Sequence, residues 1–429
     1  MKALFHTLGC KLNFAESSTI ESALTERGFT IVDRDESPDI IVVNTCTVTS
    51  EADKKSRQTI RALNRRHPEA AIFVTGCYSQ LSSDEASKLP GVVAVVGNDR
   101  KDRLAEHLDR WLSDHNPRVD VTPHITDFLP FVPSCAQGER TRWFLKVQDG
   151  CDYWCSYCTI PRARGRSRSP RIADVVAEAR RAAGKGAREI VITGVNIGDF
   201  GHGTDEDFFA LCKALDTVPG IERYRISSIE PNLLSDSLIE WIATESRAFM
   251  PHFHIPLQCG SDEVLRLMGR HYDTALFAHR ISTIRRLIPD AFIGVDLIVG
   301  FRGETDVLFD ESHDFISSLD ISRLHVFPYS ERPDTRALKI PHVVDQAEKS
   351  RRAARMLALS NDKLADFSRR FLGEVRPVLF EINGAGFTDN YLRVSRLTNA
   401  TTMPESNTIA QVRLVDFDPA SLTFTAELV

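Results

Sequence analysis

Short apolar runs that alternate with helical patterns constrain the fold of this 429-residue chain more than any other feature. Buried strands that alternate with helices form a parallel sheet, because each helix carries the chain back across one face. Near the start of the chain, the apolar runs cover residues 3–7, 40–44 and 72–75, and the helical patterns cover 15–27 and 51–66. We therefore predict an α/β protein in which residues 1–112 form an open parallel α/β domain.

The same alternation resumes after residue 140 and continues to about residue 336. Six strand candidates lie at residues 143–147, 189–193, 224–227, 252–255, 292–297 and 323–326. Helical patterns lie between them, for example at 172–183, 208–215, 273–287 and 306–319. Six βα units are too few for a closed eight-stranded barrel, so residues 141–370 are predicted to form a partial (β/α)6 barrel. In such barrels the chemistry lies at the C-terminal ends of the strands.

Two further segments complete the domain organisation. Residues 113–140 are rich in Pro, Asp and His and have no clear periodicity, which predicts a linker. Residues 371–429 alternate β-favouring runs with Gly, Asn and Asp turns, which predicts a small OB-like β-barrel. Barrels of this kind often bind oligonucleotides, and an accessory lid without RNA contact is the alternative.

Cys151, Cys155 and Cys158 follow the first barrel strand in a C-x3-C-x2-C spacing. A structural zinc ion needs a fourth ligand, and no Cys or His follows at a finger-like distance. A [4Fe-4S] cluster has four irons, so three thiolates would leave one iron open for a substrate or cofactor. The spacing therefore favours a cluster, with a zinc site or a disulfide as the alternative.

A second set of cysteines stands at the ends of the three N-terminal strands. Cys10, Cys46 and Cys77 each follow one of these apolar runs. The loops at the carboxyl ends of parallel strands converge on one crevice, so the three thiols are predicted to lie together. They are candidates for a second set of cluster ligands, and three buried structural cysteines are the alternative.

Composition limits the compartment and the partners. The chain has no apolar run of membrane-spanning length and no recognisable targeting segment, which predicts a cytoplasmic protein with reduced thiols. Because the formal net charge is −6, a nucleic acid would have to be held by local basic patches. One such patch directly follows Cys158 and includes Arg162, Arg164, Arg166 and Arg168.

Over essentially its whole length the chain resembles the methylthiotransferases of the radical S-adenosylmethionine (SAM) superfamily. The motifs that carry the resemblance are Thr-Leu-Gly-Cys10-Lys-Leu-Asn13, Asn44-Thr-Cys46, Thr75-Gly-Cys77, Gln148-Asp-Gly-Cys151, Cys158-Thr-Ile-Pro-Arg162, His254-Ile-Pro-Leu-Gln258, Met268-Gly-Arg270 and Asp296-Leu-Ile-Val-Gly300. The tail motif Gly386-Phe-Thr-Asp-Asn390 resembles the RNA-binding TRAM module.

The resemblance implies two [4Fe-4S] clusters, one on each cysteine set, and SAM as a cofactor. It also implies that a methylthio group is inserted at C2 of a modified adenine in tRNA. The opening motif resembles enzymes that act on N6-threonylcarbamoyladenosine next to the anticodon, at position 37 of the tRNA. The alternatives are N6-isopentenyladenosine, an aspartate of a ribosomal protein or, in another class, a non-catalytic two-cluster electron-transfer protein.

The resemblance also supplies candidate site residues and partners. No catalytic residue is expected beyond the cluster ligands. Polar groups at the barrel rim are candidates for SAM contacts or, alternatively, satisfied structural groups: Thr193, Gly194, Asn196, Ser228, Glu230, Gln258 and Asp296. Asn390 and Arg393 are candidates for RNA contact. A monomer is expected that needs a sulfur source and an electron donor of the flavodoxin or ferredoxin type.

Three positions depart from the family pattern. Cys259 stands where the family usually has Ser, Arg302 where it has Pro, and Asp334 where it has Gly. None of these changes removes a predicted cluster ligand, and the Cys259 change is expected to be harmless because the two side chains are nearly isosteric. Cys135 and Cys212 match no motif and are expected to be structural.

Overall fold

The computed structural model describes residues 1–429 except 124, 126–130, 132, 137–140, 382–383 and 401. The N-terminal part is a six-stranded parallel sheet with the order β2-β1-β3-β4-β5-β6. Its strands are β1 (Lys2–Thr7), β2 (Thr30–Ile31), β3 (Ile40–Thr45), β4 (Ala71–Gly76), β5 (Val92–Val96) and β6 (Arg118–Asp120). Its helices are α1 (Lys11–Glu26), α2 (Ser50–Arg66), α3 (Cys77–Leu81), α4 (Ser83–Ser87), the 3-10 helix η1 (Asn98–Arg103) and α5 (Leu104–Asp114).

Strands β3 and β4 are buried along their whole length, which explains why they appear in the sequence as continuous apolar runs. On one face the strands pack against Leu24 of α1 and Leu108 of α5, and on the other against Ile60 of α2. The three predicted strands and the two predicted helices of this segment are confirmed.

Two short strands lie in the segment that was predicted to be a linker. Strand β6 pairs with β5 and extends the first sheet, and β7 (Ser134–Ala136) pairs antiparallel with the first barrel strand. The predicted linker over residues 113–140 therefore contributes one strand to each of the two sheets, which the sequence did not predict. Strands of three residues are too short to give a periodic signal, and that is why sequence patterning missed them.

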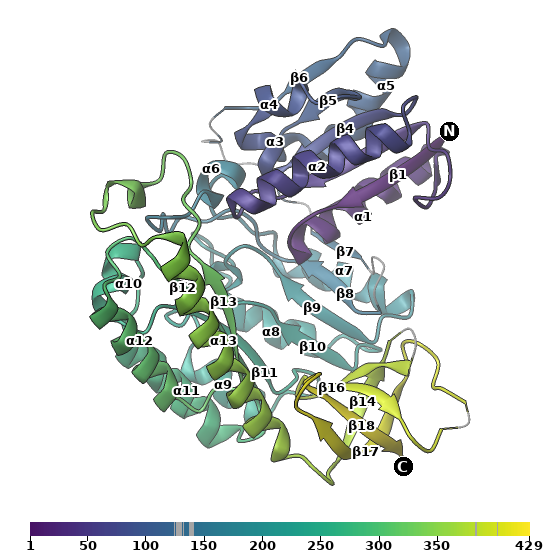
Figure 1. Ribbon diagram of the computed structural model, residues 1–429. Coiled ribbons are helices and arrows are strands. Elements are labelled where there is room, and N and C mark those ends of the chain that lie inside the picture. Colours follow the sequence, from purple (N-terminus) through teal and green to yellow (C-terminus); the bar gives the residue numbers. More distant parts are fainter. Residues whose placement is uncertain (124, 126–130, 132, 137–140, 382–383, 401) are drawn as a thin grey trace.

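The central part is a partial barrel of six parallel strands in sequential order (Figure 1). These strands are β8 (Trp143–Lys146), β9 (Glu189–Thr193), β10 (Arg223–Ile226), β11 (His252–Gln258), β12 (Phe292–Val299) and β13 (Arg323–Pro328). Isolated parallel bridges join the β8–β10 sheet to the β11–β13 sheet at Tyr224–Phe249 and Ser228–His254. The six predicted barrel strands are all present, so the predicted (β/α)6 architecture is confirmed.

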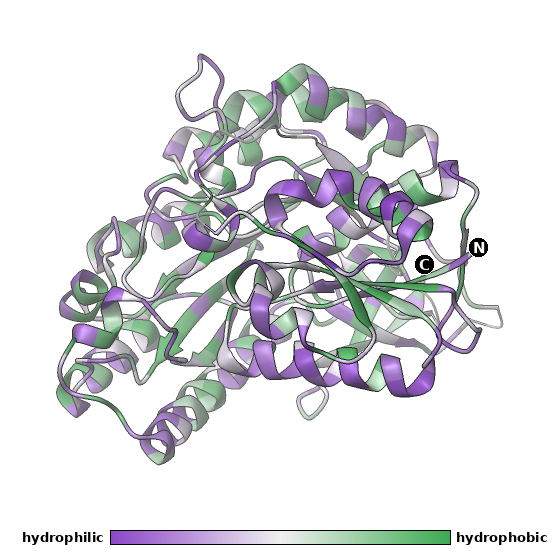
Figure 2. Ribbon diagram, turned by 90° about the horizontal axis from the view of Figure 1, so that it is seen from above, coloured by the Kyte–Doolittle hydropathy of each residue, from purple (hydrophilic) through white to green (hydrophobic). Residues whose placement is uncertain are grey.

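Helices cover the outside of this barrel, and most begin at a capping side chain. The helices are α6 (Ile160–Arg164), α7 (Ile172–Gly184), η2 (Ile197–Asp199), α8 (Phe208–Asp216), α9 (Asp236–Thr244), α10 (Asp262–Met268), α11 (Thr274–Leu287), α12 (Asp306–Ser318), η3 (Arg336–Lys339) and α13 (Gln346–Arg369). Side chains that accept from a backbone N–H three residues later start α8, α9, α11, α12 and α13: Asp207, Ser235, Asp273, Thr305 and Asp345. Seen from above, the strands are largely hydrophobic and many helices show hydrophilic outer faces (Figure 2).

The C-terminal part is the predicted small β-barrel. Five strands close in the order β14-β15-β16-β18-β17 around Phe380, Val394, Leu414 and Phe424. They are β14 (Val375–Phe380), β15 (Gly386–Thr388), β16 (Arg393–Leu397), β17 (Ile409–Asp418) and β18 (Thr423–Leu428).

Two buried arginines of β10 fasten this small barrel to the base of the large one. Arg223 donates to the carbonyl oxygens of Pro377 and Phe387, and Arg225 donates to those of Thr388 and Asp389, at 2.8 to 3.2 Å. The two barrels therefore share a fixed joint. In the part of the chain that the structure describes, no helix has the length and apolarity to cross a bilayer.

Candidate active site

The first cysteine set lies at the carboxyl edge of the N-terminal sheet. Cys10 follows β1 and caps α1, Cys46 follows β3, and Cys77 opens α3 after β4. These three strands are neighbours in the sheet, and the three thiols are close enough to perturb one another electrostatically. Burial, reinforced by the other two thiols, raises the pKa of Cys46 to about 11. A bound metal would supply the positive charge needed to keep such a thiol as a thiolate.

Gly9 allows the Cys10 and Cys46 loops to approach this closely. Its φ is +100°, and a Cβ placed there would lie 2.7 Å from Cβ and 2.9 Å from Sγ of Cys46. Any side chain at this position would collide with the cysteine and would also be strained, so only glycine fits.

The second cysteine set occupies the loop between β8 and α6. The backbone N–H of Tyr153 points at Sγ of Cys151 (3.5 Å), and that of Ile160 points at Sγ of Cys158 (3.4 Å). Burial raises the pKa of Cys151 and of Cys158 to about 12, and the neighbouring thiols add to the effect. Gly150 precedes this loop with φ +70°, and a Cβ there would lie only 1.9 Å from the carbonyl oxygen of Arg166.

Each set offers three thiols, and thiolate is the usual protein ligand of an iron–sulfur cluster. Within the described ranges, no three His, Cys, Asp or Glu side chains come together closely enough to hold one metal ion. The two sets are therefore candidate ligands for two [4Fe-4S] clusters.

Arg270 is a site residue that sequence reasoning missed. Its guanidinium lies 3.1 Å from Sγ of Cys155, pairs with Glu230, and donates to the Tyr272 hydroxyl at 3.1 Å. Burial raises the pKa of Glu230, and Arg270 acts against that rise. The Met-Gly-Arg270-His-Tyr272 motif was a usable signal, because a polar run directly after a barrel helix is a candidate rim loop.

Replacing Arg270 by Gln is expected to lower the free energy of unfolding by about 3 kcal/mol, because Glu230 would remain buried without its counter-ion. Urea unfolding of the variant measures this loss. The matched control is Arg266→Gln on the exposed side of α10, which should stay within about 0.5 kcal/mol of the parent. Equal stability of the two variants would contradict the importance of the Arg270–Glu230 pair.

The candidate SAM contacts gather along one side of the partial barrel. Thr193 ends β9, and Gly194 and Asn196 follow it. Ser228 and Glu230 follow β10, Gln258 ends β11, and Asp296 lies within β12. Gln258 ends β11 with φ +67°, a left-handed conformation that costs about 1–3 kcal/mol in a residue other than glycine. Such strain is typical of functional sites.

Gln148 organises this rim and was also missed. Its side-chain Oε1 accepts from the backbone N–H groups of Val195 and Asn196, and its Nε2 donates to the carbonyl oxygens of Asp149 and Gly150. It thereby ties the loop after β9 to the Cys151 loop. The Asn196 side chain is buried near Tyr153, and its amide atoms make no hydrogen bond of ordinary geometry among the described residues. A polar ligand such as the amino acid part of SAM would satisfy it.

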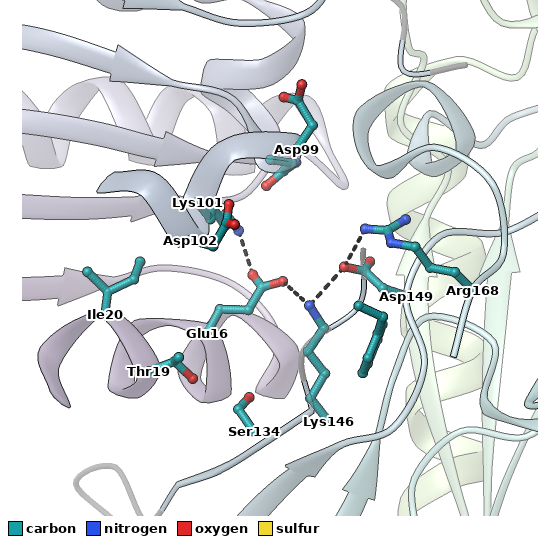
Figure 3. Close-up of a pocket in the computed structure, with 12 residues that line it drawn as sticks. Glu16, Thr19, Ile20, Asp99, Lys101, Asp102, Ser134, Lys146, Asp149 and Arg168 are labelled. Atoms are coloured by element: carbon teal, nitrogen blue, oxygen red, sulfur yellow. Dashed lines mark hydrogen bonds and ion pairs between the residues drawn. The ribbon is translucent and has the colours of Figure 1, made fainter. Parts of the chain in front are cut away.

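Six charged side chains join the two halves of the site, and Figure 3 shows all of them except Arg164. Glu16 of α1 pairs with Arg164 and Lys146, both at 2.9 Å, and with Lys101. Asp149 pairs with the same Lys146 and Arg164 and also with Arg168, at 2.9 to 3.0 Å. Burial alone would raise the pKa of Glu16, but the three cations outweigh it and hold that pKa well below its usual range. We call these six residues the interface network.

The interface network corrects two of the predicted RNA contacts. Arg164 is 2 % exposed and Arg168 is 8 % exposed, and the guanidinium groups of both pair with the buried Asp149. Arg162 and Arg166 do reach the surface, where they pair with Asp334 and Asp152. The even spacing of the four arginines concealed this division, because the segment is a short helix and a turn.

The predicted RNA contact of Asn390 is also corrected. Its side chain is fully buried, accepts from the Thr388 hydroxyl at 2.6 Å and donates to the carbonyl oxygen of Asp290. It therefore stabilises the joint between the two barrels. Arg393 is exposed on β16.

The three departures from the family pattern are accommodated locally. Cys259 is fully buried, and its thiol faces the Ser312 hydroxyl at 3.7 Å. Arg302 donates to Glu331 and to the carbonyl oxygen of Leu338. Asp334 has φ +60°, which explains why glycine suits this position, and it pairs with Arg162.

Comparisons with known proteins identify the family. The family model described as Uncharacterized protein family UPF0004 matches residues 2–97, and the Radical SAM superfamily model matches residues 145–316. The chain is 38% identical to the threonylcarbamoyladenosine tRNA methylthiotransferase MtaB of Bacillus subtilis (strain 168) over 91% of this chain and 89% of that one. The chain belongs to the radical SAM methylthiotransferases. Membership brings SAM and [4Fe-4S] clusters as the cofactors of this enzyme.

Other relatives carry the names of two kinds of enzyme, which act on threonylcarbamoyladenosine or on dimethylallyladenosine in tRNA. The threonylcarbamoyladenosine tRNA methylthiotransferase MtaB of Aquifex aeolicus (strain VF5) is 34% identical over 92% of this chain and 97% of the relative. The tRNA-2-methylthio-N(6)-dimethylallyladenosine synthase of Syntrophotalea carbinolica is 33% identical over 89% of each chain. Among solved structures, the radical SAM methyltransferase TsrM from Kitasatospora setae aligns with TM-score 0.58 and 15% identity over 78% of this chain and 76% of that one. At that identity the likeness supports the fold alone.

Proposed function

We propose that this methylthiotransferase inserts a methylthio group at C2 of N6-threonylcarbamoyladenosine next to the anticodon of tRNA. One observation carries the proposal: two cysteine triplets, one on each of two parallel α/β units, are held in a fixed relation by the buried interface network. The substrate follows from the printed names of the first relatives and from the Thr-Leu-Gly-Cys10-Lys opening.

In this proposal Cys151, Cys155 and Cys158 hold the cluster that binds SAM, and Cys10, Cys46 and Cys77 hold the second cluster. When bound, these groups supply radical chemistry, which an adenine C2–H bond requires because it has no useful acidity. The protein's own residues bind these groups and orient them. Gln148 fixes the rim loops, Arg270 holds the Cys155 loop, and the interface network sets the distance between the two triplets.

The remaining assignments belong to the same proposal. Thr193, Gly194, Asn196, Ser228, Glu230, Gln258 and Asp296 contact SAM. Arg162 and Arg166 contact the tRNA backbone, because guanidinium groups suit phosphate. Residues 1–112 form the methylthiotransferase unit, 141–370 the radical SAM core and 371–429 a TRAM-like RNA-binding unit, with 113–140 connecting the first two. The enzyme acts as a cytoplasmic monomer with a separate sulfur source and a flavodoxin- or ferredoxin-type electron donor.

The experiment is mass spectrometry of nucleosides from total tRNA, taken from cells with and without the gene. The expected result is loss of 2-methylthio-N6-threonylcarbamoyladenosine, with its unthiolated precursor accumulating. Loss of the dimethylallyl derivative instead would keep the reaction and overturn the substrate. An unchanged tRNA profile, with loss of a methylthio group from a ribosomal protein, would overturn the RNA proposal.

A further inference from the structure

A cavity of about 380 Å³ lies between the base of the large barrel and the C-terminal barrel. Its walls come from the starts of β11, β12 and β13, from α13, from the C-terminal barrel and from Lys11 of α1. The aromatic rings of Phe292, Phe387, Tyr391 and Phe424 line part of it. A cavity of this size, with apolar walls and a few polar groups, has the ordinary dimensions of a small-ligand site.

The formally charged side chains that line the cavity are all cationic. Lys11, Arg323 and Arg393 line it, and no Asp or Glu is among its described lining residues, although the whole chain carries a net charge of −6. The side chains of Arg323 and Arg393 make no hydrogen bond or ion pair with any residue that the structure describes, whereas the side chains of Arg223 and Arg225 on β10 are both paired. Two unpaired guanidinium groups and a lysine at one cavity form a site for an anion.

Two histidines connect the cavity to the candidate active site. His254 and His325 line the cavity and stack with ring centroids 5.0 Å apart, and His254 also hydrogen-bonds Asp296 at 2.7 Å. Burial lowers the pKa of His325 to about 4, so at neutral pH this ring is uncharged. On the other side Lys11 directly follows Cys10. The cavity is therefore linked to Asp296 through His254, and it includes the residue that follows Cys10.

The proposed substrate carries an anion that its dimethylallyl counterpart lacks. A threonylcarbamoyl group ends in a carboxylate and a hydroxyl, separated from the adenine ring by the carbamoyl unit, so it reaches beyond the part of the site that holds the ring. A dimethylallyl group is purely apolar and would offer no partner to the guanidinium groups of Arg323 and Arg393. An unsatisfied charged site discriminates strongly against a ligand that lacks the matching group.

We propose that Arg323 and Arg393 bind the carboxylate of the threonylcarbamoyl group and thereby select this substrate over the dimethylallyl one. The inference rests on the proposed function and assigns its substrate-recognition site. A backbone phosphate of the same RNA offers similar chemistry. The carboxylate is favoured because the cavity is large and walled by aromatic rings, whereas a phosphate contact needs only a surface arginine.

The test is the affinity of the cluster-loaded enzyme for three versions of one anticodon stem-loop RNA. The versions carry threonylcarbamoyladenosine, dimethylallyladenosine or plain adenosine at the target position. Arg323→Gln and Arg393→Gln are each expected to weaken binding of the first RNA roughly 10- to 100-fold and to leave the other two unchanged. The matched controls are Arg286→Gln on the outer helix α11 and Arg396→Gln on β16, both exposed and outside the cavity, which should not alter any of the affinities.

The possible results distinguish a wrong assignment of the cavity from a wrong assignment of the substrate. A parent enzyme that prefers the threonylcarbamoyl RNA, with both variants keeping that preference, would overturn the cavity assignment alone. Equal weakening for all three RNAs would place a phosphate at the arginines and overturn the carboxylate assignment. A parent enzyme that binds the three RNAs equally would overturn the proposed substrate together with its recognition site. Unchanged iron content and melting temperature show that the variants are folded, as expected for exposed side chains without partners.

Discussion

Glu16→Gln is expected to lower the free energy of unfolding by about 3–5 kcal/mol. The substitution keeps the shape of the side chain but removes one of the two carboxylates that balance the four cations of the interface network: Lys101, Lys146, Arg164 and Arg168. Lys101, Arg164 and Arg168 are buried and the Lys146 side chain is only 12 % exposed, so water cannot compensate for the lost charge. Because α1 brings Glu16 to the barrel from the N-terminal unit, the loss should loosen the contact between the two units first.

Urea unfolding measures the stability, and limited proteolysis between residues 113 and 140 measures the loosening. The matched control is Glu26→Gln, which removes the same charge from an exposed position of the same helix and should change stability by less than about 0.5 kcal/mol. The pKa of Glu16 lies below its unfolded value, so its contribution is present at neutral pH and is lost as the pH falls through the acid range. The difference in free energy of unfolding between the parent and Glu16→Gln should therefore decrease as the pH is lowered. A variant as stable as the parent at neutral pH would contradict a structural role for the interface network.

The triple variant Cys151→Ala, Cys155→Ala, Cys158→Ala is expected to keep roughly half of the iron and to lose methylthio transfer completely. Cys10, Cys46 and Cys77 lie on a separate sheet with their own loops, so their cluster should assemble without the other. Iron analysis and nucleoside mass spectrometry of the reacted tRNA measure the two effects. SAM cleavage should vanish as well.

The reciprocal variant Cys10→Ala, Cys46→Ala, Cys77→Ala should also keep roughly half of the iron but continue to cleave SAM. Cys212→Ala is the control, because this thiol is fully buried in the barrel core and belongs to neither set. It should retain all of the iron and the activity. A folded variant of either triplet without any iron would contradict two independent sites.

Hydrophobic periodicity predicted the layers of this fold well, because five of the six barrel strands are largely buried and alternate with helices. It missed strands β6 and β7, whose three residues are too short to show a period. Element length therefore set the limit of what patterning could find.

The candidate site divides in a similar way. The positions of the thiols can be predicted from topology, because the residues that follow parallel strands all lie at the carboxyl edge of the sheet. Side-chain pairing does not follow from spacing, because Arg162 and Arg164 differ by only two positions, yet one faces solvent and the other is buried against Glu16. Arg270 and Gln148 were missed for a related reason, because Arg270 faces Cys155 from 115 residues away and Gln148 binds the backbone of Asn196 from 48 residues away.

The joint at the base of the large barrel determines which C-terminal barrels of related enzymes could replace the one in this chain. Arg223 and Arg225 donate to four carbonyl oxygens of the C-terminal barrel, and every amino acid provides such an oxygen. This half of the joint therefore depends on the backbone path of β14 and β15, whereas Arg376, Asn390 and Tyr391 add side-chain contacts to Asp290 and Arg225. A C-terminal barrel transplanted from a distant relative should dock here if its two strands follow the same course and if it carries these three side chains.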